Sequence, residues 1–390
     1  MKKSLLLVAF AATAFASCSY DEVVDVKVDE IAFSVVADNQ TRAEEVYCQN
    51  HLMDAFDVYG TYSDGTNISW YMKGDHIKYD GQKWNNETTT RYWSENGTHN
   101  FYAIVNGKMA TSSADVPPTV NDFIPAEIVA NQQDLLYAVA TDKKKSDAQV
   151  ALNFRHALSQ IEFRAMNTNP QLYVVIKDVC VGQTPCKGTF TFPNASTDDN
   201  FVDHAQTNTH VYATGTWALA NEIADYTVNV GKIEVPGTND PIGLTLSTDV
   251  NAENRDFSKS MLLLPTSSIT GGTTAWTPSK EETKFDGTYL AVNCEIYNVA
   301  GEKYEVGDAQ LHKGWAVMPV SFNWEPGKKY IYTFIFGTGN GGYDGGDPDP
   351  DPDPDPTPDP TPDPVLTPIT YTVTVDDFQK GVDSDVEMEY

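Results

Sequence analysis

The stretch Ile369-Thr-Tyr371-Thr-Val373-Thr-Val375 alternates apolar and hydroxyl-bearing residues and is followed directly by two aspartates. Because successive side chains of a strand point to opposite faces, this alternation predicts a β-strand with one apolar and one polar face. Such a strand needs a sheet to lie against, yet only a run of Asp-Pro and Thr-Pro repeats joins it to the preceding chain. We therefore expect it to be available to the sheet of another molecule.

A second stretch with the same pattern lies near the other end of the chain, at Ile31-Ala-Phe33-Ser-Val35-Val36. The matched positions are Ile31 with Ile369, Phe33 with Tyr371, and Val35 with Val373. Two strands that present the same side chains can fill one groove in turn, so the sequence predicts that one strand replaces the other. If both strands are instead central members of their own sheets, the match is a coincidence of two well-patterned strands.

The tract from Asp347 to Pro368 has Pro at nearly every second position. Pro holds it in the extended polyproline II form, and at about 3.1 Å per residue it reaches on the order of 70 Å. The row of Asp residues suggests calcium as an alternative, but the central Gly and terminal Glu of an EF-hand loop are absent from it. The tract is interpreted as a spacer, without a metal site.

Size, composition and charge limit the number of domains, the fold and the classes of partner. A chain of 390 residues predicts two domains, and 20 Tyr, 17 Phe and 7 Trp are enough for substantial β cores. The net charge of −29 repels phosphate backbones, which excludes nucleic acid as a partner.

The N-terminus carries an export signal: Met1-Lys2-Lys3, an apolar run, and then Ala16-Ser17-Cys18. Residues 1–17 are interpreted as a lipoprotein signal peptide, because a Cys after small residues resembles the bacterial lipobox in which that Cys is lipidated. An ordinary signal with a chance Cys is the alternative. The acidic pair Asp21 and Glu22 resembles the signal that sends some lipoproteins to the cell surface.

From residue 55 onward the sequence predicts an all-β fold, because short runs rich in Tyr, Val and Ile alternate with Gly, Asn, Asp and Ser turns. The charged stretch Lys143–Asp147 is interpreted as the joint between domains 43–150 and 151–342, or else as a loop inside one domain. The principal strands are predicted at residues 31–36, 55–62, 77–79, 91–93, 100–105, 135–139, 172–181, 188–192, 210–213, 226–230, 261–264, 289–297, 314–322, 329–336 and 369–375.

Two cysteines, Cys180 and Cys186, bracket Gly182-Gln-Thr-Pro185, where we predict a turn between strands. Disulfides are permitted in an exported protein, so a bond that staples this hairpin is one interpretation, and two free thiols are the other. The sequence cannot decide whether Cys48 pairs with Cys294.

No enzymatic motif was found, and no cofactor is predicted. The letters of GxGxxG occur at residues 337–342, but Tyr343-Asp-Gly-Gly-Asp-Pro cannot begin the helix that a dinucleotide site needs. His156 lies among strand residues and is interpreted as a hydrogen-bonded structural histidine. The many carboxylates are explained as a solubilising surface. The prediction is that the protein is not an enzyme.

Several stretches together resemble the fimbrillins, the type V pilins and related surface lipoproteins of Gram-negative anaerobes. They are the lipobox at Cys18, IAFSVV at 31–36 with TRA at 41–43, NFRHALSQIEFRA at 153–165, GTFTF at 188–192, MLLLP at 261–265, WEPGKKYIYTF at 324–334 and ITYTVTVDDF at 369–378.

The resemblance implies two transthyretin-like β-sandwich domains, a Pro/Asp-rich linker at 343–368 and a separate C-terminal donor strand within 369–390. It implies that a lipidated precursor reaches the outer membrane and is cut between Arg42 and Ala43. Propeptide 18–42 then leaves with its strand, and the C-terminal strand of another copy or a related pilin fills the groove. The long Asp-Pro tract departs from the simplest pilins, so the place of the subunit in a fibre stays open.

A monomeric surface lipoprotein is the alternative function. In that case the tail strand folds back onto its own sheet, and loop Tyr and Trp residues bind a glycan or a host protein.

Overall fold

A computed structural model describes residues 29–35, 54–147, 149–197, 200–204, 207–211, 213–245, 259–268, 273–276, 285–301, 303–304, 306, 314–337 and 370–377. Several sequence predictions fall outside these described residues. They are the signal peptide, Cys18, the bond Arg42–Ala43, Cys48, the linker at 343–368 and Ile369.

The all-β prediction is confirmed, since the described residues form 23 strands and only two short 3₁₀ helices. The N-terminal half is built on one six-stranded sheet, whose order is β4 (Trp84–Asn86), β3 (Ile68–Tyr79), β2 (Ala55–Ser63), β5 (Thr98–Val105), β7 (Leu136–Lys143) and β9 (Arg155–His156). A separate parallel pair consists of β1 (Ala32–Val35) and β8 (Gln149–Leu152). Residues 91–93, predicted as a strand, form only an isolated bridge between Tyr92 and Glu30.

Alternation assigns the side chains of this sheet to two faces, and both faces of its central strand β5 are buried. In β2 the residues Phe56 and Val58 are buried, and in β5 the residues Phe101 and Ala103 are buried. They form one core cluster with residues of β1 and β8. The charged stretch Lys143–Asp147, which includes the 3₁₀ helix η2 (Lys145–Asp147), therefore connects β7 and β8 within one core.

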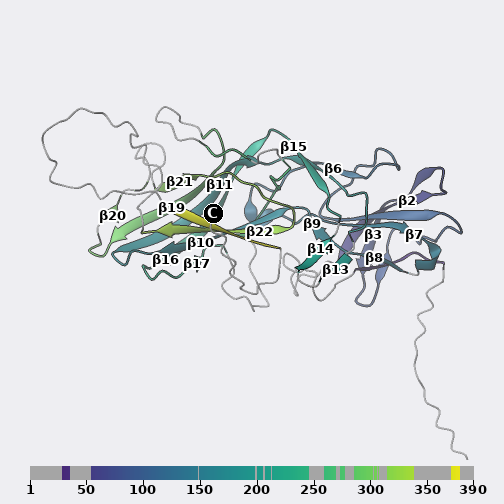
Figure 1. The fold of residues 1–390 in the computed structure, drawn as a ribbon, viewed down its shortest axis with the longest axis horizontal. Helices are drawn as coiled ribbons and strands as arrows, with labels where there is room; N and C mark the ends of the chain where they lie inside the picture. The colour runs from purple at the N-terminus through teal and green to yellow at the C-terminus, as the bar shows by residue number, and fades with distance from the viewer. Residues whose placement is uncertain are drawn as a thin grey trace, which may run out of the picture.

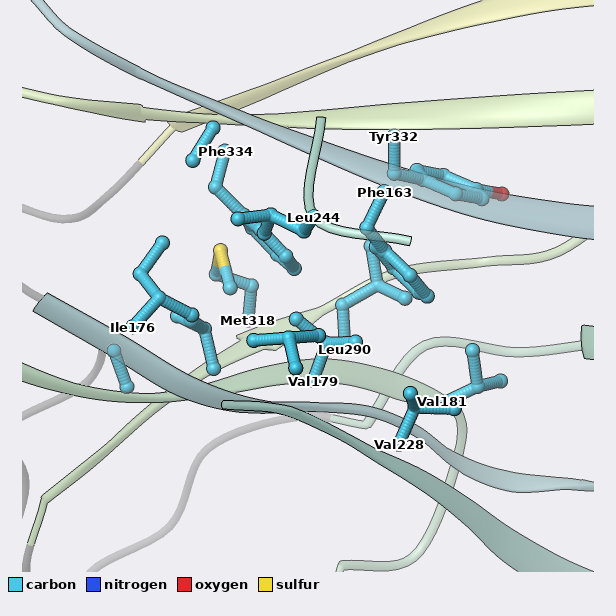
Figure 2. Close-up of a cluster of buried hydrophobic side chains, with 14 of the residues drawn as sticks. Phe163, Ile176, Val179, Val181, Val228, Leu244, Leu290, Met318, Tyr332 and Phe334 are labelled. Carbon is cyan, nitrogen blue, oxygen red and sulfur yellow. The ribbon is translucent and has the colours of Figure 1, made fainter. Parts of the chain in front are cut away.

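The C-terminal half contains two facing sheets. One has the order β17 (Ile242–Gly243), β10 (Ser159–Asn167), β22 (Lys328–Phe336) and β23 (Thr370–Asp377), with β18 (Met261–Leu263) also paired to β10. The other has the order β16 (Ile223–Val235), β11 (Leu172–Pro185), β19 (Tyr289–Asn298) and β20 (Lys303–Tyr304), with β21 (Trp315–Pro319) also paired to β19. Figure 2 shows Phe163 and Phe334 of the first sheet pointing toward Val179 and Leu290 of the second, as in a β-sandwich.

A small sheet connects the two halves. Its order is β15 (Thr216–Leu219), β12 (Gly188–Thr191) and β6 (Thr119–Phe123), and β13 (Asn200–His204) pairs with β14 (Thr207–Val211) nearby in the chain. The 3₁₀ helix η1 (Val129–Asn131) follows β6. Figure 1 shows β6 and β15 between an end that holds β2, β3 and β8 and an end that holds β16, β19 and β20. Since β8 and β9 still pair with strands of the N-terminal half, we propose that any domain boundary comes after His156.

The predicted disulfide between Cys180 and Cys186 is wrong, because both are free thiols. The predicted turn between them is absent: β11 continues to Pro185, with a register shift between Val181 and Thr184. Gln183 occupies this bulge at a φ of 55° and donates its N–H to Asp225 Oδ1 over 2.8 Å. Six residues of extended chain span about 20 Å, far beyond the Cα separation of about 7 Å that a disulfide allows.

Candidate functional site

Strand β1 lies between β8 and residues 91–93. It runs parallel to β8, with Phe33 opposite Val150. On its other side the Ile31 N–H donates to Arg91 O over 2.8 Å, and the Trp93 N–H donates to Asp29 O over 2.8 Å. Residues 29–31 are therefore bonded to residues 91–93, and β1 itself is bonded to β8, its only partner strand among the described elements.

The side chains of β1 and of Ile31, which directly precedes it, complete the N-terminal core. Ile31 is 5% exposed and Phe33 is 3% exposed, while Val35 is half-buried against the same cluster. The Phe33 ring meets Phe101 edge to face at 5.4 Å between centroids and meets Phe56 at 6.5 Å. Removing β1 would expose these partners to solvent, so the predicted departing strand is an integral part of this core.

Polar contacts hold the two ends of β1. Gln149 Nε2 donates to the Phe33 carbonyl over 3.1 Å. At the start of the strand, Lys145 Nζ lies 2.9 Å from Asp29 Oδ1 and 2.9 Å from Glu95 Oε1. Because these charges are at the surface, solvent and salt screen each pair and it contributes little to stability. The apolar contacts therefore dominate the attachment of β1.

A partly buried ion pair fixes the segment that borders β1. Arg91 donates from Nε to Asp75 Oδ2 over 2.7 Å and from Nη2 to Asp75 Oδ1 over 2.9 Å. The Asp75 hydrogen bond raises the pKa of Arg91. Next along the chain, the Tyr71 hydroxyl donates to Tyr92 O over 2.7 Å. These bonds keep the carbonyl of Arg91 in place to accept from Ile31.

His99 of β5 lies in the same core inside a box of aromatic rings, which we call the His99 box. The rings are Tyr62 at 5.2 Å, Tyr71 at 5.1 Å, Trp93 at 5.5 Å and Phe101 at 5.8 Å. His99 is 1% exposed, and neither ring nitrogen has a hydrogen-bond partner among the described residues; nor does Trp93 Nε1. Burial lowers the pKa of His99, so the ring is neutral at neutral pH.

Strand β23, the predicted donor, lies at the edge of its own C-terminal sheet. It pairs antiparallel with β22, placing Tyr371 opposite Phe334, Val373 opposite Tyr332, and Val375 opposite Tyr330. The Tyr371 side chain is 36% exposed and its ring lies 6.2 Å from that of Tyr332. The tail strand is thus neither free nor central: in the uncut chain it has folded back, as the monomeric alternative expects.

The described residues contain no group of three or more His, Cys, Asp or Glu side chains suited to a metal ion. His156 Nδ1 bonds to Asp134 Oδ2 inside the core, which confirms its structural role. Among those same residues no helix is long and apolar enough to span a membrane.

Sequence reasoning found β1 and β23 but missed the groove around β1. The parallel partner β8 is more than a hundred residues away in the chain, and only the fold brings it close. Residues 91–93 were predicted as an ordinary strand, and nothing local marked His99 as buried without a polar partner.

A family model described as fimbrillin-like matches residues 41–346. Among solved structures, a fimbrial protein from Bacteroides vulgatus aligns at a TM-score of 0.51 with 12% identity, over 90% of this chain and 100% of that one. A candidate cell-adhesion protein from Bacteroides uniformis aligns at a TM-score of 0.39 with 14% identity, over 90% of this chain and 99% of that one. No curated protein matches the sequence. At this identity the first likeness shows the fold alone.

Proposed function

The chain belongs to the fimbrillin-like family, and from that premise we propose that it is a structural subunit of cell-surface fimbriae that supports adhesion. In this proposal it is exported as a lipoprotein, lipidated at Cys18 and held at the outer membrane. A protease cuts between Arg42 and Ala43, and β1 leaves. The C-terminal strand of another copy then enters the vacated groove, which links subunits head to tail.

The observation that carries the proposal is the position of β1. Ile31 and the four-residue strand β1, both within the expected propeptide, place two nearly fully buried side chains, Ile31 and Phe33, in a core otherwise built from residues 54–154. The expected cleavage site follows only seven residues after Val35. A cut there would leave β1 attached by non-covalent contacts alone.

Strand replacement is physically reasonable at this groove. Loss of β1 would expose backbone groups of β8 and of residues 91–93, and an incoming strand satisfies them while its alternate side chains fill the pockets. Fully burying an apolar side chain contributes about 1.5–3 kcal/mol. Burial of the three matched apolar side chains of the tail therefore contributes about 5–9 kcal/mol of binding free energy, before the cost of ordering the tail.

The donor must first leave β22. This step is feasible because β23 pairs with a single strand at a sheet edge, and Tyr371 remains partly exposed there. In the groove of β1 the matching position, Phe33, is only 3% exposed. The incoming strand would therefore bury more apolar surface in a neighbour than on its own sheet, which favours exchange.

Arg42→Ala tests the maturation step. The variant chain should keep β1 and remain monomeric under a trypsin-like protease that converts the wild type into polymers. Lys78→Ala, a change at an exposed residue of β3, serves as the control and should polymerise normally. Processing at Ala43 in the Arg42 variant would show that the proposed site is incorrect.

Deletion of residues 369–390 tests the donor step. The truncated chain should be cut after Arg42 like the wild type and yet form no polymers. Polymers of normal length from this chain would exclude β23 as the donor.

A second candidate function is a monomeric surface lipoprotein that binds a glycan or a host protein. The observation that favours it is the pairing of β23 with β22 in the same chain. Electron microscopy of protease-treated protein separates the two functions, because only the fimbrial subunit gives filaments.

A further inference from the structure

The two strands that would occupy the groove in turn differ by a single chemical group at their matched positions. Ile31, directly before β1, and Phe33 and Val35 of β1 correspond to Ile369, Tyr371 and Val373 of the tail. Both sets supply Ile, an aromatic ring and Val in the same order. The difference is the hydroxyl of Tyr371, which Phe33 lacks. A buried tyrosine hydroxyl usually finds a hydrogen-bond partner, so an acceptor groove for this strand should hold one.

Unpartnered polar atoms lie in the core that β1 completes. His99 is 1% exposed and Trp93 is 5% exposed, yet within the described residues neither His99 ring nitrogen nor Trp93 Nε1 has a hydrogen-bond partner. Buried polar groups are nearly always paired, and each one left unpaired carries a desolvation penalty. These atoms therefore remain without hydrogen bonds while β1 is in place.

These atoms lie one ring away from Phe33. The Phe33 ring contacts Phe101 at 5.4 Å, and Phe101 stacks on His99 at 5.8 Å with an interplanar angle of 10°. Trp93 closes the cluster, at 6.0 Å from Phe101 and 5.5 Å from His99. The aromatic rings next to Phe33 suit an incoming aromatic ring, and the unpartnered nitrogens of His99 and Trp93 lie next to Phe101.

We propose that the His99 box is the recognition point of the groove, where the Tyr371 hydroxyl of a second copy binds in place of the Phe33 ring. This inference rests on the proposed function. A neutral imidazole has one nitrogen that accepts, so the hydroxyl donates to His99. The indole of Trp93 can only donate, so its N–H suits the hydroxyl oxygen. The donor strand would form hydrogen bonds with atoms that β1 leaves unpaired, which favours replacement of β1 by the donor strand.

The protonation state of His99 agrees with this role. Burial without a charged partner lowers its pKa, so the ring keeps a free acceptor nitrogen at neutral pH. The titratable side chains that face it are Tyr62 from β2 and Tyr71 from β3, and Arg91 lies over the Tyr71 ring at 5.4 Å. Lys143 of β7 is its register partner.

The test compares four full-length chains: the wild type, Tyr371→Phe, His99→Phe and the double variant. Each is processed with a trypsin-like protease, and the rate at which its polymers dissociate in guanidinium chloride is measured. Loss of the bond to His99 should speed dissociation about tenfold in His99→Phe, and Tyr371→Phe, which also loses the bond to Trp93, should dissociate at least as fast. The double variant should dissociate no faster than Tyr371→Phe, because that change already removes the shared bond.

Two controls separate recognition from general destabilisation. Unfolding of the uncut monomers checks that each variant folds, and Tyr371→Phe, on the partly exposed edge strand, should leave that curve unchanged. Tyr79→Phe removes a hydroxyl from another partly exposed ring and should leave polymers as stable as the wild type.

The outcomes distinguish this inference from the proposed function. Wild-type polymers that are no more stable than Tyr371→Phe polymers, or single effects that multiply in the double variant, would overturn the role of the His99 box while strand exchange stands. A wild-type chain that is cut after Arg42 but forms no polymer would refute the proposed function, and the recognition point with it.

Discussion

Phe33→Ala should destabilise the uncut chain but leave the assembled polymer unaffected. Phe33 is 3% exposed and packs edge to face against Phe101 and Phe56. Replacing a buried Phe by Ala costs about 3–5 kcal/mol, because the transfer free energy is lost and a cavity remains. In the uncut chain this penalty should fall on the N-terminal core. In the polymer, residue 33 has departed and Tyr371 of a neighbour fills its place, so the penalty should vanish.

The assay is guanidinium unfolding of the variant before and after protease treatment, beside the wild type. Phe163→Ala is the matched control, since Phe163 is fully buried in β10 and remains in the chain in both states. That control should lose stability both before and after assembly. If Phe33→Ala weakens the polymer as much as it weakens the monomer, β1 remains in its groove and the exchange mechanism is refuted.

Three further predictions concern the chemistry of the cores. Burial raises the pKa of Cys180 and of Cys294 to about 12, so iodoacetamide at pH 8 should label neither thiol in the native protein and both after denaturation. A Cys180–Cys186 disulfide found by peptide mapping would contradict the structure. Burial lowers the pKa of His99 from 6.5, so the unfolded chain takes up the proton first and the N-terminal core should lose stability as the pH falls below 6.5. Urea unfolding between pH 7.5 and 5 should show a smaller loss of stability in His99→Phe than in the wild type, and an equal loss would exclude His99 as the cause. Arg91→Lys keeps the charge but loses the two-bond contact with Asp75, which holds the Arg91 carbonyl that accepts from the Ile31 N–H. The Ile31 amide should therefore exchange hydrogen at least about tenfold faster, and an unchanged rate would show that this ion pair does not hold the groove.

The strands at both ends of the described chain could be predicted from local pattern alone. Alternation at Phe33 and Val35, and at Tyr371 and Val373, reports directly which face is apolar, because the period of a strand is two. The fimbrillin-like family could also be recognised, since short motifs occur in the expected order along the chain. Neither signal says which strand each one pairs with.

Pairing depends on long-range geometry that a sequence does not display. Val150 lies opposite Phe33 only because the sheet folds between them. Gly182-Gln-Thr-Pro185 has the composition of a turn, yet Asp225 on the neighbouring strand accepts from Gln183 and turns the stretch into a bulge. The neighbour on β16 overrides the local preference, which is why the predicted turn and disulfide were wrong.

The His99 box was hidden for a related reason. His99 follows Thr98 at the start of β5, where a polar residue usually faces solvent. Its burial results from Tyr62, Tyr71 and Trp93, which come from separate segments of the chain. A sequence shows that a histidine is present but not that its nitrogens lack partners.

Cryo-electron microscopy of fibres assembled from the protease-treated chain tests the central claim most directly. The account predicts that residues 29–42 are gone and that residues 369–375 of a neighbouring subunit lie along β8, with Tyr371 in the place of Phe33. Fibres in which β1 still lies beside β8 and β23 still pairs with β22 of its own chain would contradict it.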